Sequence, residues 1–131
     1  ERFDEITPGG SLGILTELDP AVVKSDNLAG NLAGIPGKLP KTYLKLKLKP
    51  KLIKRVVGVK EEVEVVPITQ GEMLVINVNS AVTLGMVVDT SKNIVSMNLR
   101  LPIVASKQDR FAISRRVGAR WHLIGVGELV E

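Results

Sequence analysis

Within residues 42–50, leucine and lysine alternate strictly from position 44 to position 49, and this pattern constrains the fold more than any other part of the chain. Leu44, Leu46 and Leu48 occupy every second position, and lysines fill the positions between and after them. Side chains on a strand point alternately to opposite faces. The pattern therefore predicts a strand whose three leucines meet a core while its lysines face water or phosphate.

Composition extends this prediction to the whole chain. Apolar residues make up 44% of the sequence but aromatic residues only 3%, so the core must be aliphatic. Abundant β-branched residues, with 12 glycines and 7 prolines, favour an all-β fold with many turns. Further strands are predicted at residues 63–66, 72–79, 82–90, 93–101, 111–117 and 121–130. Short strands at this spacing predict a closed antiparallel barrel, which also removes exposed edges.

The first part of the chain has a different character. Strands are expected at residues 12–18 and 28–35, and the second of these is rich in glycine. Between them, Asp19 and Pro20 are typical of a helix start, with aspartate as the N-cap and proline at the first helical position. We expect a single helical turn to follow.

A linker separates two predicted domains. The sequence Pro-Gly-Lys-Leu-Pro at residues 36–40 is the clearest linker in the chain. Residues 1–35 are therefore predicted to belong to one β-domain and residues 41–131 to a second, complete barrel. Position 1 is glutamate rather than methionine, so we expect the chain to be a fragment or a processed product.

Basic residues are concentrated between residues 38 and 55, where no acidic residue occurs. The net charge of +4 is modest, but this asymmetry favours a polyanion near one face. The candidates to face RNA are Lys41, Lys45, Lys47, Lys49, Lys51, Lys54 and Arg55. A solvated strand face is the alternative interpretation for each of them.

A second basic group lies in residues 110–128, which read as two strands joined by a tight turn at Gly118. Arg115, Arg116 and Arg120 crowd this turn. Like charges so close together repel one another, which is tolerable if an anion or an acidic partner lies against them.

Catalytic and metal chemistry is not predicted. The chain has no cysteine and a single histidine, His122, which excludes thiolate zinc sites and disulfides and suits a reducing cytosol. Ser114 is expected near His122, but no carboxylate is nearby in sequence to orient the imidazole ring. We predict no catalytic residue and no metal ligand.

Nucleotide and membrane binding are not predicted either. Gly37 and Lys38 superficially match a phosphate-binding loop, but Leu32 and Leu39 replace the required glycine and hydroxyl residue. No apolar stretch is long enough to span a membrane, and no signal peptide is visible. We therefore expect a cytoplasmic chain that holds no cofactor.

The order of several motifs resembles one known family. The motifs are Pro-Gly-Gly at residues 8–10, Leu-Asp-Pro at 18–20, the linker at 36–40, Arg-Val-Val-Gly-Val-Lys-Glu-Glu at 55–62, Gly-Glu-Met-Leu at 71–74 and the run at 110–128. Together they resemble the gamma subunit of archaeal and eukaryotic translation initiation factor two, a relative of elongation factor Tu. The Lys-Glu-Glu form is more similar to archaeal members.

This resemblance implies a structural and a functional expectation. Residues 41–131 would form a Greek-key barrel like the third domain of elongation factor Tu, and residues 1–35 would end the second domain. GTP and Mg²⁺ would bind in a G domain absent from this sequence. The complete subunit would carry initiator tRNA to the small ribosomal subunit, together with alpha and beta subunits.

The resemblance also implies a role for the hairpin of residues 110–128. In this family the matching hairpin lies against the G domain, so Arg115, Arg116, Arg120 and Trp121 are expected to form an interdomain interface rather than contact RNA. The alternative for the whole chain is a stand-alone barrel that binds RNA or an acidic protein.

Overall fold

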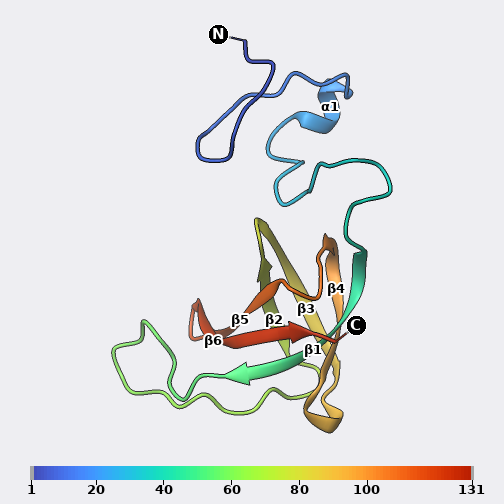
Figure 1. The fold of residues 1–131 in the computed structure, drawn as a ribbon. Coiled ribbons are helices and arrows are strands. Elements are labelled where there is room, and N and C mark those ends of the chain that lie inside the picture. The colour runs from blue at the N-terminus through green and yellow to red at the C-terminus, as the bar shows by residue number, and fades with distance from the viewer. Residues whose placement is uncertain (1, 131) are drawn as a thin grey trace.

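The structure, a computed structural model, describes residues 2–130 and contains a closed antiparallel barrel (Figure 1). Its helical elements are α1 (Pro20–Val23) and the 3-10 turn η1 (Ser91–Asn93). The strands are β1 (Thr42–Leu52), β2 (Met73–Val78), β3 (Ala81–Asp89), β4 (Val95–Val104), β5 (Arg110–Val117) and β6 (Arg120–Leu129). The predicted all-β fold is confirmed.

The strand order is β1-β4-β3-β2-β5-β6, and β6 closes the barrel against β1. Strands β2, β3 and β4 follow one another as hairpins, while the long connection of residues 53–72 brings β1 beside β4. Three strands joined as successive hairpins, with a fourth strand placed beside them by a long connection, form a Greek key. Here β1 is that fourth strand. The topology expected from the resemblance is therefore present.

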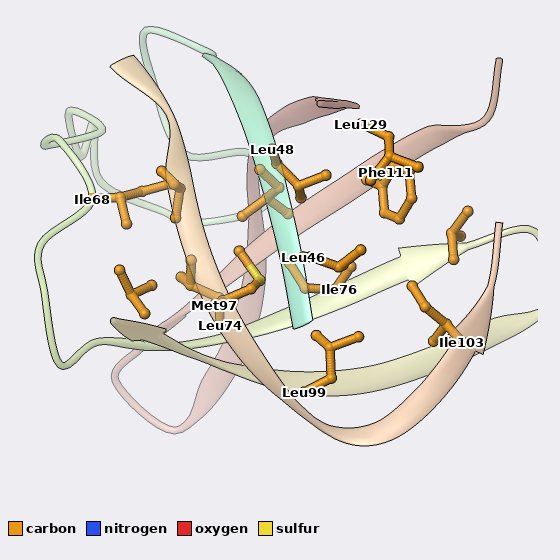
Figure 2. Close-up of a cluster of buried hydrophobic side chains, with 14 of the residues drawn as sticks. Leu46, Leu48, Ile68, Leu74, Ile76, Met97, Leu99, Ile103, Phe111 and Leu129 are labelled. Atoms are coloured by element: carbon orange, nitrogen blue, oxygen red, sulfur yellow. The ribbon is translucent and has the colours of Figure 1, made fainter. Parts of the chain in front are cut away.

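The core is aliphatic, as the composition predicts. Leu46 and Leu48 on β1 are fully buried and pair with Met97 and Val95 on β4. Figure 2 shows Leu46, Leu48 and Met97 in the core of the barrel, with Phe111 beside Leu129. The rest of the core consists largely of Ile, Leu and Val from the other strands, for example Leu74, Ile76, Val87, Ile103, Ile113, Ile124 and Leu129.

The prediction that Leu44 joins this core is wrong. Leu44 is 56% exposed, whereas Leu46 and Leu48 are at most 1% exposed. The pairing of β1 with β4 shifts register between Tyr43 and Lys45, so the regular alternation is interrupted at Leu44. An irregularity of this kind redirects a side chain without changing the sequence pattern.

The strands expected at residues 12–18 and 28–35 are not formed. Both segments lack regular structure, and residues 2–40 are almost entirely exposed outside the barrel (Figure 1). An isolated strand leaves its backbone groups without partners, and none of the described strands pairs with these segments. The predicted helix start is confirmed, because the Asp19 side chain accepts a hydrogen bond of 2.8 Å from the Ala21 amide.

One predicted strand is absent, and the end of another differs from the prediction. Residues 63–66 do not form a strand, and the connection contains only an isolated bridge between Arg55 and Glu64. Strand β4 continues to Val104, beyond the predicted end at residue 101, because pairing with β1 resumes after the register shift.

Close approach of two strands closes the barrel at Gly125. This residue pairs with Leu52 of β1 and Ile113 of β5. A Cβ atom at this position would lie 2.6 Å from the carbonyl oxygen of Lys51 and 2.9 Å from the Leu52 Cα. Both obstacles are backbone atoms, so a side chain can be accommodated only if β1 moves away from β6.

We predict that Gly125→Ala destabilises the barrel by roughly 3 kcal/mol, at the upper end of the usual cost of overpacking. The measurement is urea unfolding followed by the fluorescence of Trp121, the only tryptophan. The matched control is Val126→Ala on the exposed face of the same strand, which should change stability by less than about 1 kcal/mol. Equal effects of the two substitutions would contradict the close approach.

Candidate functional surfaces of the barrel

Four lysines form a row on the outer side of β1. Lys45, Lys47, Lys49 and Lys51 are all exposed, and the residues between them point inward. With two residues per repeat, the row extends over about 20 Å. The structure thus places these four sequence-predicted residues on one surface.

Two arginines from neighbouring strands extend this surface. Lys45 pairs with Asn98, and exposed Arg100 lies two residues further along β4. On the other side, Glu128 of β6 lies between Lys49 of β1 and Arg110 of β5. We call Lys45, Lys47, Lys49, Lys51, Arg100 and Arg110 the basic face.

The sequence does not predict Arg100 and Arg110 on this surface, because only the strand order brings them there. In the sequence, Arg100 and Arg110 occupy outward positions of alternating strand patterns. Such a pattern shows which way the side chains point but not which strand lies next to them. Among the described residues, two carboxylates adjoin these six cations: Glu128, opposite Lys49, and exposed Asp89, which pairs with Ser96 beside Lys47.

The other three predicted RNA-facing residues lie outside this row. The Lys41 ammonium nitrogen lies 5.4 Å from the centroid of the Tyr43 ring, a cation–π arrangement. Arg55 forms an ion pair with Glu62 in the connection of residues 53–72. Lys54 follows the end of β1 and is exposed.

The hairpin between β5 and β6 presents a basic and aromatic tip. Arg116 pairs with Trp121, and Arg120 adjoins them at the turn, where Gly118 has a positive φ of 63°. Trp121 is 42% exposed, which is unusual for so large an apolar side chain. Arg116 also donates a bond of 3.3 Å to the Gly118 carbonyl oxygen.

Arg115 points away from this tip and holds the long connection in place. Its guanidinium forms an ion pair with Glu72, with one bond of 3.0 Å between Nη2 and Oε2. It also donates to the carbonyl oxygens of Val66 at 2.8 Å and Pro67 at 3.1 Å. Both charged side chains are more than four-fifths buried. The guanidinium of Arg115 is therefore committed to contacts within the barrel.

His122 also contacts the connection rather than Ser114. Its Nδ1 atom lies 3.0 Å from the carbonyl oxygen of Val57. Ser114 pairs with Leu123, while His122 pairs with Arg115, so adjacent positions place Ser114 and His122 on opposite faces. Within residues 2–130, no group of three His, Cys, Asp or Glu side chains could hold a metal ion.

The residues around Gly37 do not fit a nucleotide phosphate. Gly37 has a positive φ of 79° in an exposed bend, and residues 32–39 contain neither a strand nor a helix. A phosphate-binding loop needs a strand before it and a helix after it, whose amides point at the phosphate. Among the helices of the described residues, none has the length and apolarity needed to cross a membrane.

The chain is similar to one family of known proteins. Residues 44–129 match the family model described as "Initiation factor eIF2 gamma, C terminal". Translation initiation factor 2 subunit gamma from Methanococcus maripaludis (strain C7) is 45% identical over 127 residues, 97% of this chain and 31% of that protein. The Archaeoglobus fulgidus protein of the same name is 50% identical over 127 residues, 96% of this chain and 30% of that protein. The protein of the same name from Thermococcus onnurineus is 47% identical over 131 residues, which are 99% of this chain and 32% of that protein. The chain thus spans about a third of the length of these curated relatives.

We predict that Arg115→Met destabilises the protein by roughly 2–3 kcal/mol, because a partly buried carboxylate and two carbonyl groups lose a charged donor. Unfolding in urea gives the magnitude, and hydrogen exchange of residues 63–72 should become faster. The matched control is Arg116→Met, an exposed arginine on the adjacent position, which should change stability by less than about 0.5 kcal/mol. Similar hydrogen exchange in both variants would show that Arg115 does not hold the connection.

Proposed function

Because the chain belongs to the family of translation initiation factor 2 gamma subunits and matches their C-terminal part, we propose that it is the C-terminal barrel of a cytoplasmic GTP-binding factor. In this proposal the complete subunit carries initiator methionyl-tRNA to the small ribosomal subunit and assembles with alpha and beta subunits. The barrel has a supporting role: it braces the G domain and offers one basic face to RNA.

The basic face is the observation that carries the RNA part of this proposal. Six cations from β1, β4 and β5 share one surface, and among the described residues the carboxylates beside them are Glu128 and Asp89. Lysine and arginine rows of this kind bind phosphates by releasing counterions, without reading base sequence. Contact with ribosomal or transfer RNA through the backbone is the interaction that suits this surface.

The tip of the β5–β6 hairpin supports the interdomain part of the proposal. Arg116, Arg120 and Trp121 are exposed together, and a large apolar side chain flanked by arginines is typical of a protein interface. We propose that these three residues contact the G domain. Arg115, the fourth residue expected there, instead supports the hairpin from inside through its contacts with Glu72 and the connection.

Residues 1–35 are proposed to complete a second barrel, with residues 36–40 as the linker to the barrel of residues 41–131. The support is an excess of exposed apolar side chains ahead of the linker. These include Phe3, Ile6, Leu12, Ile14, Leu15, Leu18, Leu28 and Leu32. Apolar side chains at this density are suited to a core that other strands complete.

GTP and Mg²⁺ are proposed to bind in the part of the subunit that corresponds to the remaining length of the relatives. Residues 32–39 lack the geometry for a phosphate group, as described above, and residues 2–130 contain no cluster of metal-binding side chains. The barrel is thus proposed to act on the nucleotide-dependent step only by supporting the domain that performs it.

The RNA proposal is tested by replacing Lys45, Lys47 and Lys49 together with glutamine. Binding of an initiator tRNA transcript should weaken, and the slope of log K against log salt should fall by up to about 3, since each lost phosphate contact removes roughly 0.9. The control variant replaces Lys24, Lys60 and Lys107, which lie off the basic face, with the same change in net charge. If the two variants show the same slope, the basic face does not bind RNA.

The interdomain proposal is tested with 5-fluorotryptophan, which labels only Trp121. Adding the unlabelled first two thirds of the Thermococcus onnurineus relative should shift the fluorine resonance and protect it from solvent. Replacing Arg116 and Arg120 with alanine should weaken this association at least threefold, whereas Lys107→Ala should not change it. A complex verified by sedimentation that leaves the resonance unmoved would place the hairpin tip outside the interface.

A further inference from the structure

A hollow of about 470 Å³ opens at the end of the barrel where β1 ends and β3 turns into β4. Six of its eight lining residues are apolar, while Thr90, Asn93 and backbone polar atoms make about half of the exposed lining polar. The apolar lining residues are Pro50, Leu52, Pro67, Ile68, Ile94 and Val95. The volume lies within the usual range of small binding sites, about 300–1,000 Å³.

One side of this hollow is an incompletely paired strand. Strand β1 continues to Leu52, but among the described residues its pairing with β4 ends at Leu48 opposite Val95. The other edge of β1 stays paired with β6 as far as Leu52 and Gly125. Pro50 and Leu52 face this open side, and because proline has no N–H, Leu52 supplies the backbone donor there. An edge that is open on one side can accept an extended segment from another protein. The geometry of the hollow therefore suits an extended peptide.

The turn beside the hollow keeps a lysine in an unfavourable conformation. The Ile94 amide donates to the Ser91 carbonyl oxygen at 3.0 Å, and the two residues between them, Lys92 and Asn93, have φ values of 54° and 57°. This left-handed geometry suits asparagine and glycine but not lysine. A strained residue next to a hollow is a reason to look for a function of its side chain.

Positive charge surrounds the hollow. Lys49 and Lys51 flank Pro50 on β1, Lys54 follows β1, and Lys92 adjoins Asn93. Two acids lie near these four lysines: Glu128 is opposite Lys49 in the β1–β6 register, and Asp89, which keeps its negative charge, accepts a bond of 2.5 Å from the Ser91 hydroxyl. This bond lowers the pKa of the Asp89 carboxyl below its ordinary value.

The chemistry of the walls distinguishes a peptide from a nucleic acid. Single-stranded nucleic acid binds where aromatic side chains stack on its bases, whereas the lining residues here are aliphatic or proline apart from Thr90 and Asn93. Apolar walls bind apolar side chains, and the surrounding lysines attract carboxylates.

We propose that the hollow binds an extended acidic peptide segment of a protein partner. One or two apolar side chains of the segment occupy the space lined by Leu52, Ile68 and Ile94. Its backbone runs along the open edge of β1, and its carboxylates lie beside Lys51 and Lys92. This site overlaps the basic face at Lys51, whereas Lys92 and the hollow lie outside that face.

The test uses the full chain and a set of dye-labelled peptides of the form Asp-Asp-x-x-Asp-Asp, where x is Leu, Ile, Val, Met, Phe, Tyr or Trp. At least one member should bind, and the amide resonances of Leu52, Ile68 and Asn93 should shift. Replacing both x residues with serine should reduce affinity more than tenfold. Replacing the four aspartates with lysine should abolish binding.

Lys92→Asn separates a binding role from a structural one. Because asparagine tolerates the left-handed turn, this variant should raise Tm by about 3 °C while weakening the best peptide about threefold. Lys107→Asn, at the β4–β5 turn, should alter neither quantity.

Two results would overturn the proposal: no peptide of the set binding below 1 mM, or peptide affinity unchanged in Lys92→Asn. If Lys92→Asn instead lowers the salt slope for the tRNA transcript and no peptide binds, the lysine belongs to the RNA surface and the peptide site does not exist. Failure of the RNA proposal alone leaves these peptide measurements unaffected.

Discussion

The contact on which the structure depends is the approach of β6 to β1 at Gly125. The absence of a side chain there lets the backbone of β1 come within van der Waals range, and this contact closes the sheet. Closure gives every barrel strand two neighbours along most of its length, although β1 stays open on its β4 side beyond Leu48. It also separates the inside from the outside, so that Leu46 and Leu48 enter the core while the lysines between and after them remain in water.

The closed barrel determines which charges become neighbours. Arg110 is distant in sequence from Lys49, yet both flank Glu128 because β6 lies between their strands. Conversely, Arg115 and Arg116 are adjacent in sequence but project to opposite sides. One is held by Glu72 and backbone carbonyls inside the barrel, and the other is exposed at the hairpin tip. The fold thus gives these two neighbouring arginines different surroundings.

Local periodicity predicted most of the strands, since alternation at β1 and at the β5–β6 hairpin reflects burial on one face. It could not predict Leu44, because the register shift that exposes this residue depends on the partner strand β4. The strands expected at residues 12–18 and 28–35 have apolar character but no neighbours to pair with among the described strands. The role of Arg115 required knowledge of where residues 66–72 pass. Interactions set by distant segments were thus inaccessible from the sequence alone.

The Greek-key order has a consequence for how the chain is made. Leu48 pairs with Val95 and Leu129, both far downstream, so during synthesis β1 leaves the ribosome long before its partners. An aliphatic segment that stays unpaired during synthesis is prone to associate with copies of itself. The alternating lysines counter this tendency, because stacking identical strands would bring like charges together. The same ammonium groups that form a surface in the finished barrel thus act as gatekeepers for the nascent polypeptide.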